Sequence, residues 1–289
     1  MSTETIEDAG RRTLRVVHTT TFDYEAPVTA SYNEARMTPA AGPAQDVLDA
    51  SVAVQPTTWS HEYVDYWGTT VTAFEVLEPH RRLTIVATAT VEVAPPPGGG
   101  GQATWEELGG EDVVDAQAAY LTDSATTAVP DDVAALALDV AAGLDPESAA
   151  EAICLALRDR LDYVPGVTTA HTPAAEAWLA RKGVCQDMAH LCAGALRSVG
   201  IPARYVSGYL YPVTDGVVGE TVTGESHAWI EWWTGAWRGY DPTNRRRAGL
   251  DHVVLGRGRE YEDVAPLKGV YAGAAASDLE VTVEITRTA

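Results

Sequence analysis

Residues 172–211 decide the fold: TPAAEAWLARKGVCQDMAHLCAGALRSVGIPARYVSGYLY. The segment 173–182 is helix-forming and stops at Gly183, a residue type that often ends helices. Beyond it, apolar residues recur every three or four positions from 188 to 199, which predicts a second helix with one buried face. Cys185 therefore lies at or just before the N-terminus of that helix. Unpaired backbone N–H groups and the helix dipole favour a thiolate there, so the position suits a nucleophile.

On either side of this stretch, the chain divides into a β-rich first half and a second half in which helices precede a sheet. Val- and Thr-rich runs bounded by Gly and Pro predict short antiparallel strands at 15–24, 48–55, 62–66, 70–76 and 83–93. Ala/Leu-rich segments predict helices at 131–142 and 146–161. Period-two patterns predict strands at 203–211, 226–233, 236–240 and 279–286. We therefore expect an α+β protein whose N-terminal domain is an antiparallel β-sandwich-like unit.

The run of three prolines and four glycines at residues 95–101 is the clearest discontinuity, and it indicates an interdomain linker or a long loop. The expected organisation follows from it: a disordered N-terminus at 1–13, a β-rich domain at 14–95, a linker and helical connection at 96–129, and a core with a C-terminal strand at 130–289. The loop at 212–224 carries three glycines, which predicts either a mobile gate near the site or an ordinary hairpin loop.

Composition excludes several classes of function. The formal net charge of −21 argues against a nucleic-acid partner, because phosphate binding needs Lys and Arg. No apolar run reaches membrane-spanning length, and the N-terminus lacks the apolar core of a signal peptide, so we expect a cytoplasmic protein with no membrane partner. The three cysteines, Cys154, Cys185 and Cys192, form no disulfide framework and are expected to be reduced. The oligomeric state cannot be predicted from these features.

A nucleophilic thiol needs a base, and the base needs a group that orients it. His190 follows Cys185 by five helical positions, which rotates it roughly 140° away and indicates a packing role. His227 begins the strand at 226–233, and Asp241 ends the strand that returns. A hairpin that turns about Thr234 would place His227 and Asp241 opposite each other, about 5 Å apart, on one face. A two-residue turn would place them on opposite faces, so this chemistry requires an odd-numbered loop or a bulge.

Each of these residues also has an ordinary structural interpretation. Taken alone, Cys185 would be a small buried residue, His227 a core histidine and Asp241 a turn residue. Asp187 and Arg204 are charged within apolar segments, and we interpret them as a buried structural pair or a cap. The cysteines lack a Cys-x-x-Cys spacing, so neither a metal nor another cofactor is expected. Trp229, Trp232, Trp233 and Trp237 are interpreted as core and groove wall.

Several segments, taken in order, resemble the core of the bacterial transglutaminase-like superfamily. They are Gly183-Val184-Cys185-Gln186-Asp187, Ala189-His190-Leu191, Gly200-Ile201-Pro202-Ala203-Arg204, Ser226-His227-Ala228-Trp229 and Asp241-Pro242-Thr243-Asn244. The stretch from Arg15 through residues 33–39 resembles the β-rich N-terminal region that often accompanies such cores. Residues 251–264 resemble the usual continuation, except that Arg257-Gly258-Arg259-Glu260-Tyr261 stands where many relatives have Gly-Arg-Asp-Tyr.

The resemblance implies a papain-like α+β core and acyl transfer by a Cys-His-Asp triad. Cys185 would be the nucleophile, His227 the general base and acid, and Asp241 the residue that orients the imidazole. The expected activity is hydrolysis of an amide or peptide bond, with a peptide or protein as substrate. The alternatives are a protein-glutamine transglutaminase, in which an amine accepts the acyl group, and a non-catalytic binding protein that retains the fold.

Overall fold

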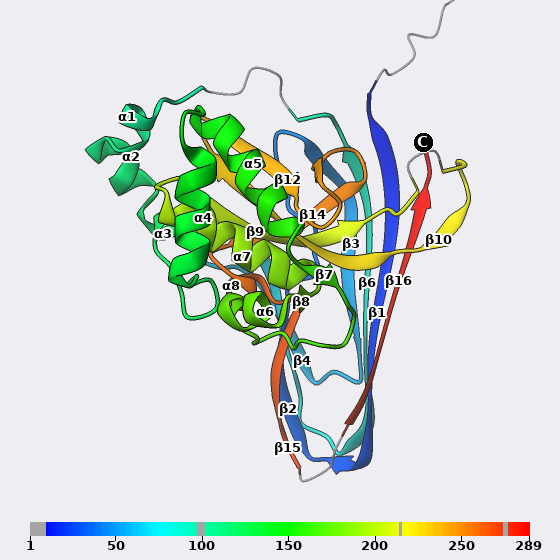
Figure 1. The fold of residues 1–289 in the computed structure, drawn as a ribbon. Coiled ribbons are helices and arrows are strands. Elements are labelled where there is room, and N and C mark those ends of the chain that lie inside the picture. Colours follow the sequence, from blue (N-terminus) through cyan, green and yellow to red (C-terminus); the bar gives the residue numbers. More distant parts are fainter. Residues whose placement is uncertain (1–9, 97–101, 214–215, 274–276) are drawn as a thin grey trace, which may run out of the picture.

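The computed structural model describes residues 10–96, 102–213, 216–273 and 277–289 (Figure 1). Its N-terminal part contains β1 (Arg12–Val28), β2 (Ala30–Ala35), β3 (Gln45–Gln55), β4 (Trp59–Val64), β5 (Thr70–Val76) and β6 (His80–Val93). These strands divide between two antiparallel sheets, and side chains of β1 and β6 share one hydrophobic core with side chains of β2 and β5. The predicted sandwich-like arrangement is therefore present. β2 was not expected, because it lies between the predicted strands at 15–24 and 48–55, where no strand was predicted.

The end of the chain returns to the N-terminal sheets. β16 (Ser277–Arg287) pairs with β1 over eleven positions, from Leu14↔Arg287 to Tyr24↔Ser277. β15 (Leu267–Ala272) pairs with β2, and Figure 1 shows the red β16 beside the blue β1. The C-terminal strand was predicted, but we placed it in the core at 130–289. It instead lies in the sheet β10-β16-β1-β6-β3, in which β10 comprises Thr221–Thr223.

The loop predicted at 212–224 is partly built into that sheet. Its residues 221–223 form β10 (Thr221–Thr223), which pairs with β16. Two further backbone hydrogen bonds, Gly219 N–H to Arg287 O at 2.8 Å and Gly224 N–H to Val283 O at 2.8 Å, attach it to the same strand. The described part is therefore more ordered than a free gate would be. Residues 214–215 and most of the Pro/Gly run, residues 97–101, lie outside the described residues.

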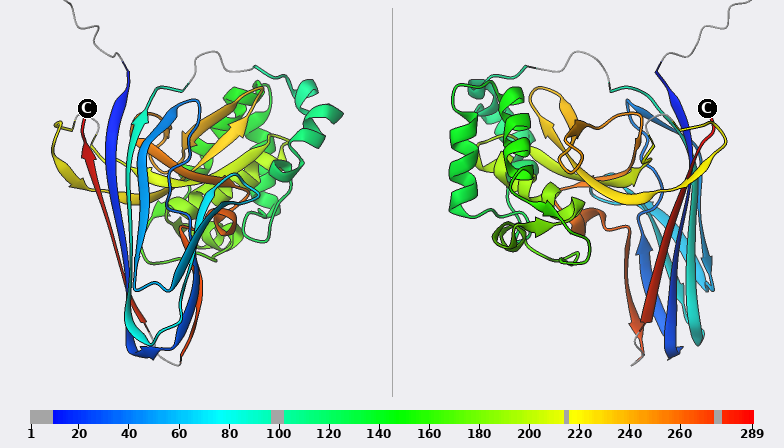
Figure 2. Two further views of the ribbon diagram at one scale, coloured as in Figure 1. Left: turned by 180° about the vertical axis from the view of Figure 1, so that it is seen from behind. Right: turned by 45° about the vertical axis from the view of Figure 1, so that its right-hand side comes forward.

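The core consists of helices packed on one face of the sheet β13-β12-β11-β9-β14 (Figure 2). Its strands are β9 (Ala203–Leu210), β11 (Glu225–Trp233), β12 (Trp237–Asp241), β13 (Arg246–Arg247) and β14 (His252–Gly258). Its helices are α4 (Asp131–Ala141), α5 (Pro146–Arg158), α6 (Ala174–Ala180), α7 (Cys185–Ser198) and α8 (Tyr261–Val264), preceded by the short α1 (Trp105–Leu108), α2 (Glu111–Ala116) and α3 (Ala118–Leu121). The α+β class is confirmed. Among the described residues, no helix combines the length and the apolarity needed to span a membrane.

α7 is the central helix of this core. Every residue from 187 to 197 is buried, because α7 packs between the sheet and the helices α4, α5 and α6. The helix begins at Cys185, as predicted. The preceding helix α6 ends earlier than expected: Arg181, not Gly183, adopts the left-handed conformation that ends it, with φ 56°. Gly183 serves a different purpose, because a Cβ there would lie 2.7 Å from the Cβ of Asp187.

Gly208 in β9 permits the close approach of two neighbouring strands. A Cβ at this position would lie 2.1 Å from the carbonyl oxygen of Val253 and 2.5 Å from the Trp229 ring. We expect Gly208→Ala to lower the free energy of unfolding by about 1–3 kcal/mol, measured by urea denaturation, because backbone cannot move away as a flexible side chain can. Gly42→Ala is the matched control, since a Cβ there meets nothing within 4 Å. Equal stability of the two variants would contradict this packing argument.

Candidate active site

The N-terminus of α7 holds Cys185 in a half-buried position. Just before it, β8 (Lys182–Gly183) pairs in parallel with β7 (Asp162–Tyr163). The Asp187 carboxylate then fixes the start of the helix: it accepts hydrogen bonds from the Val184 N–H at 2.7 Å and from the Thr168 hydroxyl at 2.7 Å. Asp187 is thus a helix cap, one of the two roles predicted for it. It is not paired with Arg204, which binds Glu231 instead.

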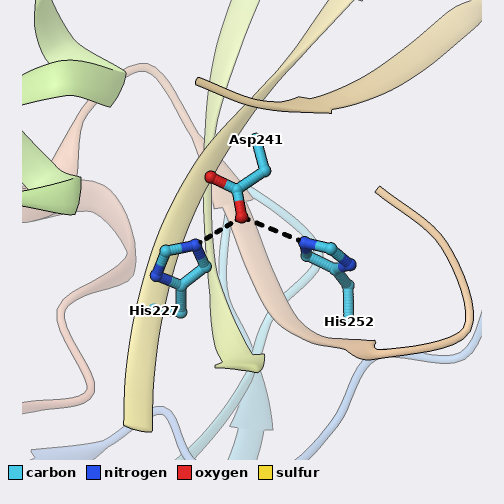
Figure 3. Close-up of side chains that lie close together, drawn as sticks. All are labelled: His227, Asp241 and His252. Carbon is cyan, nitrogen blue, oxygen red and sulfur yellow. Dashed lines mark hydrogen bonds and ion pairs between the residues drawn. The ribbon is translucent and has the colours of Figure 1, made fainter. Parts of the chain in front are cut away.

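His227 and Asp241 lie on adjacent strands, β11 and β12, and point to the same face of the sheet. The His227 Nε2 is 2.8 Å from the Asp241 Oδ2, and both residues are buried (Figure 3). The hairpin between the strands closes at Trp233↔Trp237, so its loop has three residues. An odd-numbered loop was predicted, and it keeps the two side chains on one face. The predicted register was wrong by two positions: extending the observed pairing places Asp241 opposite Trp229, so it reaches His227 diagonally.

The pKa of His227 depends on Cys185 as well as on Asp241, because both side chains lie near the ring and raise its pKa. Burial lowers the pKa of His227, but the hydrogen bonds to Asp241 and Cys185 and the charges of both raise it to about 10. Burial raises the pKa of Asp241, yet hydrogen bonds from His227 and His252 hold it well below its usual range. At neutral pH, the ring is therefore an imidazolium with two N–H donors, one for the carboxylate and one for the sulfur.

His252 on β14 is a third member of this network. Its Nε2 is 3.3 Å from the Asp241 Oδ2, on the opposite side of the carboxylate from His227 (Figure 3). Its Nδ1 accepts a hydrogen bond from the Gly249 N–H at 3.2 Å, so the proton of a neutral ring must be on Nε2. Burial keeps the pKa of His252 below its ordinary value, which makes the ring neutral and a donor to Asp241. Asn244 donates to the same oxygen through its Nδ2, at 2.7 Å.

The ring nitrogens of His227 and His252 and a carboxylate oxygen of Asp241 lie within 4.8 Å of one another, a spacing that a metal ion could bridge. The protonation pattern opposes such a site. Because the Gly249 N–H occupies Nδ1 of His252, the Nε2 that faces Asp241 carries a proton, and a protonated nitrogen cannot bind a metal. The absence of a metal and of any other cofactor stays a prediction.

Cys154, Cys192, His190 and His18 are buried outside this network. Cys154 and Cys192 are buried in the helical core, and burial raises the pKa of the Cys154 thiol. His190 accepts a hydrogen bond from the Tyr261 N–H at 3.0 Å, and burial lowers its pKa to about 3. It is therefore neutral, which agrees with the packing role predicted for it. His18 is likewise neutral, because burial lowers its pKa to about 4.

Known protein families match both halves of the chain. Residues 14–92 match the bacterial transglutaminase-like N-terminal region, and residues 134–242 match the transglutaminase-like superfamily. An uncharacterised protein of Mycobacterium leprae is 48% identical over 276 residues, which span 96% of this chain and 99% of that protein. The chain belongs to the transglutaminase-like superfamily.

Two other similarities concern characterised or solved relatives of this transglutaminase-like chain. A crystal structure of a candidate cysteine protease from Cytophaga hutchinsonii has a TM-score of 0.77 and covers 97% of this chain and 92% of its own, with 22% sequence identity. At that identity, the similarity shows the fold alone. A protein-glutamine gamma-glutamyltransferase of Pseudomonas aeruginosa is 33% identical over 135 residues, which span 40% of this chain and 20% of that enzyme.

His252 was not predicted as a site residue. A signal for it was present, because residues 251–264 resemble the segment that follows the core in the transglutaminase-like superfamily. Nothing in the local pattern of β14 indicates that this histidine faces Asp241. The contact depends on the pairing of β14 with β9, in which His252 lies opposite Leu210. The assignment of Trp229 as a wall residue fits its packing against both His227 and His252, with ring centroids 6.1 and 5.1 Å apart.

His252→Ala tests whether this third residue positions Asp241. We expect kcat/KM to fall about threefold to tenfold, because Asp241 keeps its other donors but loses one that fixes its orientation. The measurement is steady-state kinetics on an amide substrate, with urea denaturation to compare folding. His61→Ala is the matched control, since His61 is exposed on β4. Unchanged kcat/KM in both variants would show that His252 does not position Asp241.

Proposed function

We propose that this transglutaminase-like protein is a cysteine-dependent hydrolase of amide or peptide bonds. The observation that carries the proposal is the connected series Cys185–His227–Asp241, in which a half-buried thiol meets an imidazole whose pKa is raised to about 10. Such a thiol–imidazole pair is the arrangement that nucleophilic catalysis by cysteine requires. The assembled series also disfavours a non-catalytic binding protein, because no binding function requires the three side chains to be connected.

The reaction would proceed in two halves. In the first, the Cys185 sulfur attacks the carbonyl carbon, and the C–N bond breaks as His227 gives its proton to the leaving amine. In the second, His227 takes a proton from water, whose oxygen attacks the thioester. The C–S bond then breaks, which releases the carboxylic acid and restores the Cys185 thiolate beside the protonated His227. Asp241 holds the ring in the orientation that both halves need and stabilises the imidazolium.

The N-terminus of α7 can stabilise negative charge that develops on the reacting carbonyl oxygen. Cys185 is the first residue of the helix, so its backbone N–H has no partner within the helix. A donor at that position, reinforced by the helix dipole, can stabilise the oxyanion that forms when sulfur attacks. The Asp187 cap supports this arrangement because it fixes the backbone of Val184 immediately before the nucleophile.

Transfer to an amine is the second candidate function, and its support is the partial similarity to the Pseudomonas aeruginosa gamma-glutamyltransferase. We favour water as acceptor because transfer needs a site that holds an amine in line and limits competing water. The chain contains only two lysines, Lys182 and Lys268, so cross-linking of its own copies is a poor explanation for the triad.

A single pair of assays distinguishes the two functions. The full chain is incubated with a peptide library and, separately, with a Gln-containing protein and a labelled primary amine. We expect Cys185-dependent release of hydrolysis products without added amine, followed by mass spectrometry. Efficient Cys185-dependent incorporation of the amine, with negligible hydrolysis of every peptide tested, would assign transglutaminase activity instead.

A further inference from the structure

A cavity of about 540 Å³ lies behind the Asp241 network, between the N-terminal region and the core sheet. One wall is formed by residues 40–45 and by Val93, Ala94 and Pro96, and the other by β11, β12 and β14. Its volume is within the range of small-molecule sites. Cys185 does not line it. His227, Asp241 and His252 lie between the Cys185 thiol and the cavity, and of these His252 lines the cavity. The cavity is therefore separate from the place where a substrate carbonyl would react.

The charge of the cavity differs in sign from that of the whole protein. Among its charged lining residues, Arg204 and Arg257 both bind the single carboxylate of Glu231, so this cluster has one more positive than negative charge within a chain of −21. Burial raises the pKa of Glu231, but the charges of Arg257 and Arg204 outweigh burial and keep its pKa low, so it is a carboxylate. Two arginines thus share one acid, and the cavity keeps an excess of positive charge.

Arg257 has N–H groups that Glu231 does not use. It binds Glu231 through its Nε alone, at 3.0 and 3.1 Å from the two carboxylate oxygens. Within the described residues, the Nη1 and Nη2 groups of Arg257 form no hydrogen bond. Two parallel N–H groups of a planar guanidinium match the two oxygens of a carboxylate. Trp229 and Trp237 also line the cavity, and the Trp237 ring stacks against Arg204, 3.9 Å from its guanidinium carbon.

The cavity is held open by fixed contacts between its two walls. The Gln45 Nε2 donates to the carbonyl oxygens of Ala40 and Val254, at 2.7 and 2.9 Å, and its Oε1 accepts from the Val254 N–H at 2.8 Å. The Ala40 N–H also donates to the Val254 carbonyl at 2.9 Å. Because the hydrogen bonds to Val254 cross from the N-terminal region to β14, a ligand would meet a site that is already formed.

We propose that this cavity is a binding site for a small organic carboxylate with an aromatic body. The carboxylate would bind the Nη groups of Arg257, and the aromatic body would lie against Trp229 and Trp237. The site is distinct from the proposed catalytic thiol, and its existence does not depend on which reaction the thiol performs.

The test uses isothermal titration calorimetry on the full chain with 2-naphthoate and with its neutral analogue 2-naphthamide. We expect 2-naphthoate to bind one site per chain, at least tenfold more tightly than the amide. The affinity should be the same in the Cys185→Ala variant, because the thiol does not line the cavity. Equal affinity for the two compounds, no binding of either, or dependence on Cys185 would overturn the proposal.

Two variants localise the binding. Arg257→Gln should lower the affinity for 2-naphthoate at least tenfold, while Glu231 keeps Arg204 as its partner. Its matched control is Arg15→Gln, an exposed arginine on β1 that should leave the affinity unchanged. Gly42→Phe keeps every arginine and should block both compounds, because a Cβ at Gly42 meets nothing within 4 Å in this lining segment. Unchanged binding in either Arg257→Gln or Gly42→Phe would place the ligand elsewhere.

Discussion

Cys185→Ala is expected to lower kcat for an amide substrate on the order of 10⁴-fold or more, because no other group can form the thioester. Backbone donors at the start of α7 remain in the variant, so any residual rate comes from substrate binding and oxyanion stabilisation alone. The measurement is product release by mass spectrometry. A covalent adduct of the substrate's acyl group on Cys185, trapped by acid quench of the wild-type protein, would identify the intermediate directly.

Cys192→Ala is the matched control for this experiment. Cys192 lies on the same helix, seven positions from Cys185, but it is 1% exposed and packs in the helical core. Its replacement should lower the free energy of unfolding and leave kcat for the amide substrate nearly unchanged. Full activity in Cys185→Ala, or an equal loss in Cys192→Ala, would remove Cys185 from the mechanism.

Asp241→Asn is expected to lower kcat on the order of 10³–10⁴-fold while the fold is retained, because the amide cannot hold the imidazolium that both halves of the reaction use. The buried His227 loses the charge that most opposes its desolvation, so its pKa falls from about 10 toward and below the ordinary value. In the wild type, loss of activity as His227 deprotonates should occur as the pH rises through about 10. In the variant, the same alkaline limb should move to lower pH. A pH–rate profile measures both effects.

Asn244→Ala separates the charge of Asp241 from the hydrogen bonds that surround it. Asn244 donates its side-chain N–H to the Asp241 Oδ2 at 2.7 Å and its backbone N–H to the Oδ1 at 3.1 Å. The alanine variant removes only the side-chain donor and leaves the carboxylate charged, so we expect a loss of less than about tenfold. If the pH at which activity is lost on the alkaline side were the same in Asp241→Asn as in the wild type, Asp241 would not be the cause of the raised His227 pKa.

Local sequence patterns predicted many elements of this fold, because each of these depends on residues that are near one another in the chain. The start of α7 at Cys185 and the limits of β5 follow from periodicity and from Gly or Pro breaks. The return of β16 to β1 could not be predicted, since clean alternation shows that a strand has one buried face but not which sheet it joins. β14 and β15 were not predicted as strands, and their partners lie about 50 and about 240 residues away in the chain.

The site was predictable to the extent that its residues occur in recognisable segments. Cys185, His227 and Asp241 each lie in such a segment, and the structure brings His227 and Asp241 to 2.8 Å from each other. The role of Cys185 with them stays a prediction. The details that depend on strand register were not predictable. The hairpin turns one residue later than expected, at Gly235 with φ 97°, and His252 reaches Asp241 only through the pairing of β14 with β9.

The central claim is that His227 activates the Cys185 thiol, and the rate of alkylation by iodoacetamide at pH 7 tests it most directly. The rates for Cys154, Cys185 and Cys192 are measured in the native protein by peptide mass spectrometry. We predict that Cys185 reacts at least a hundredfold faster than the two buried cysteines, and that His227→Ala lowers its rate at least tenfold without exposing the others. A Cys185 rate that is unchanged by His227→Ala would contradict the account.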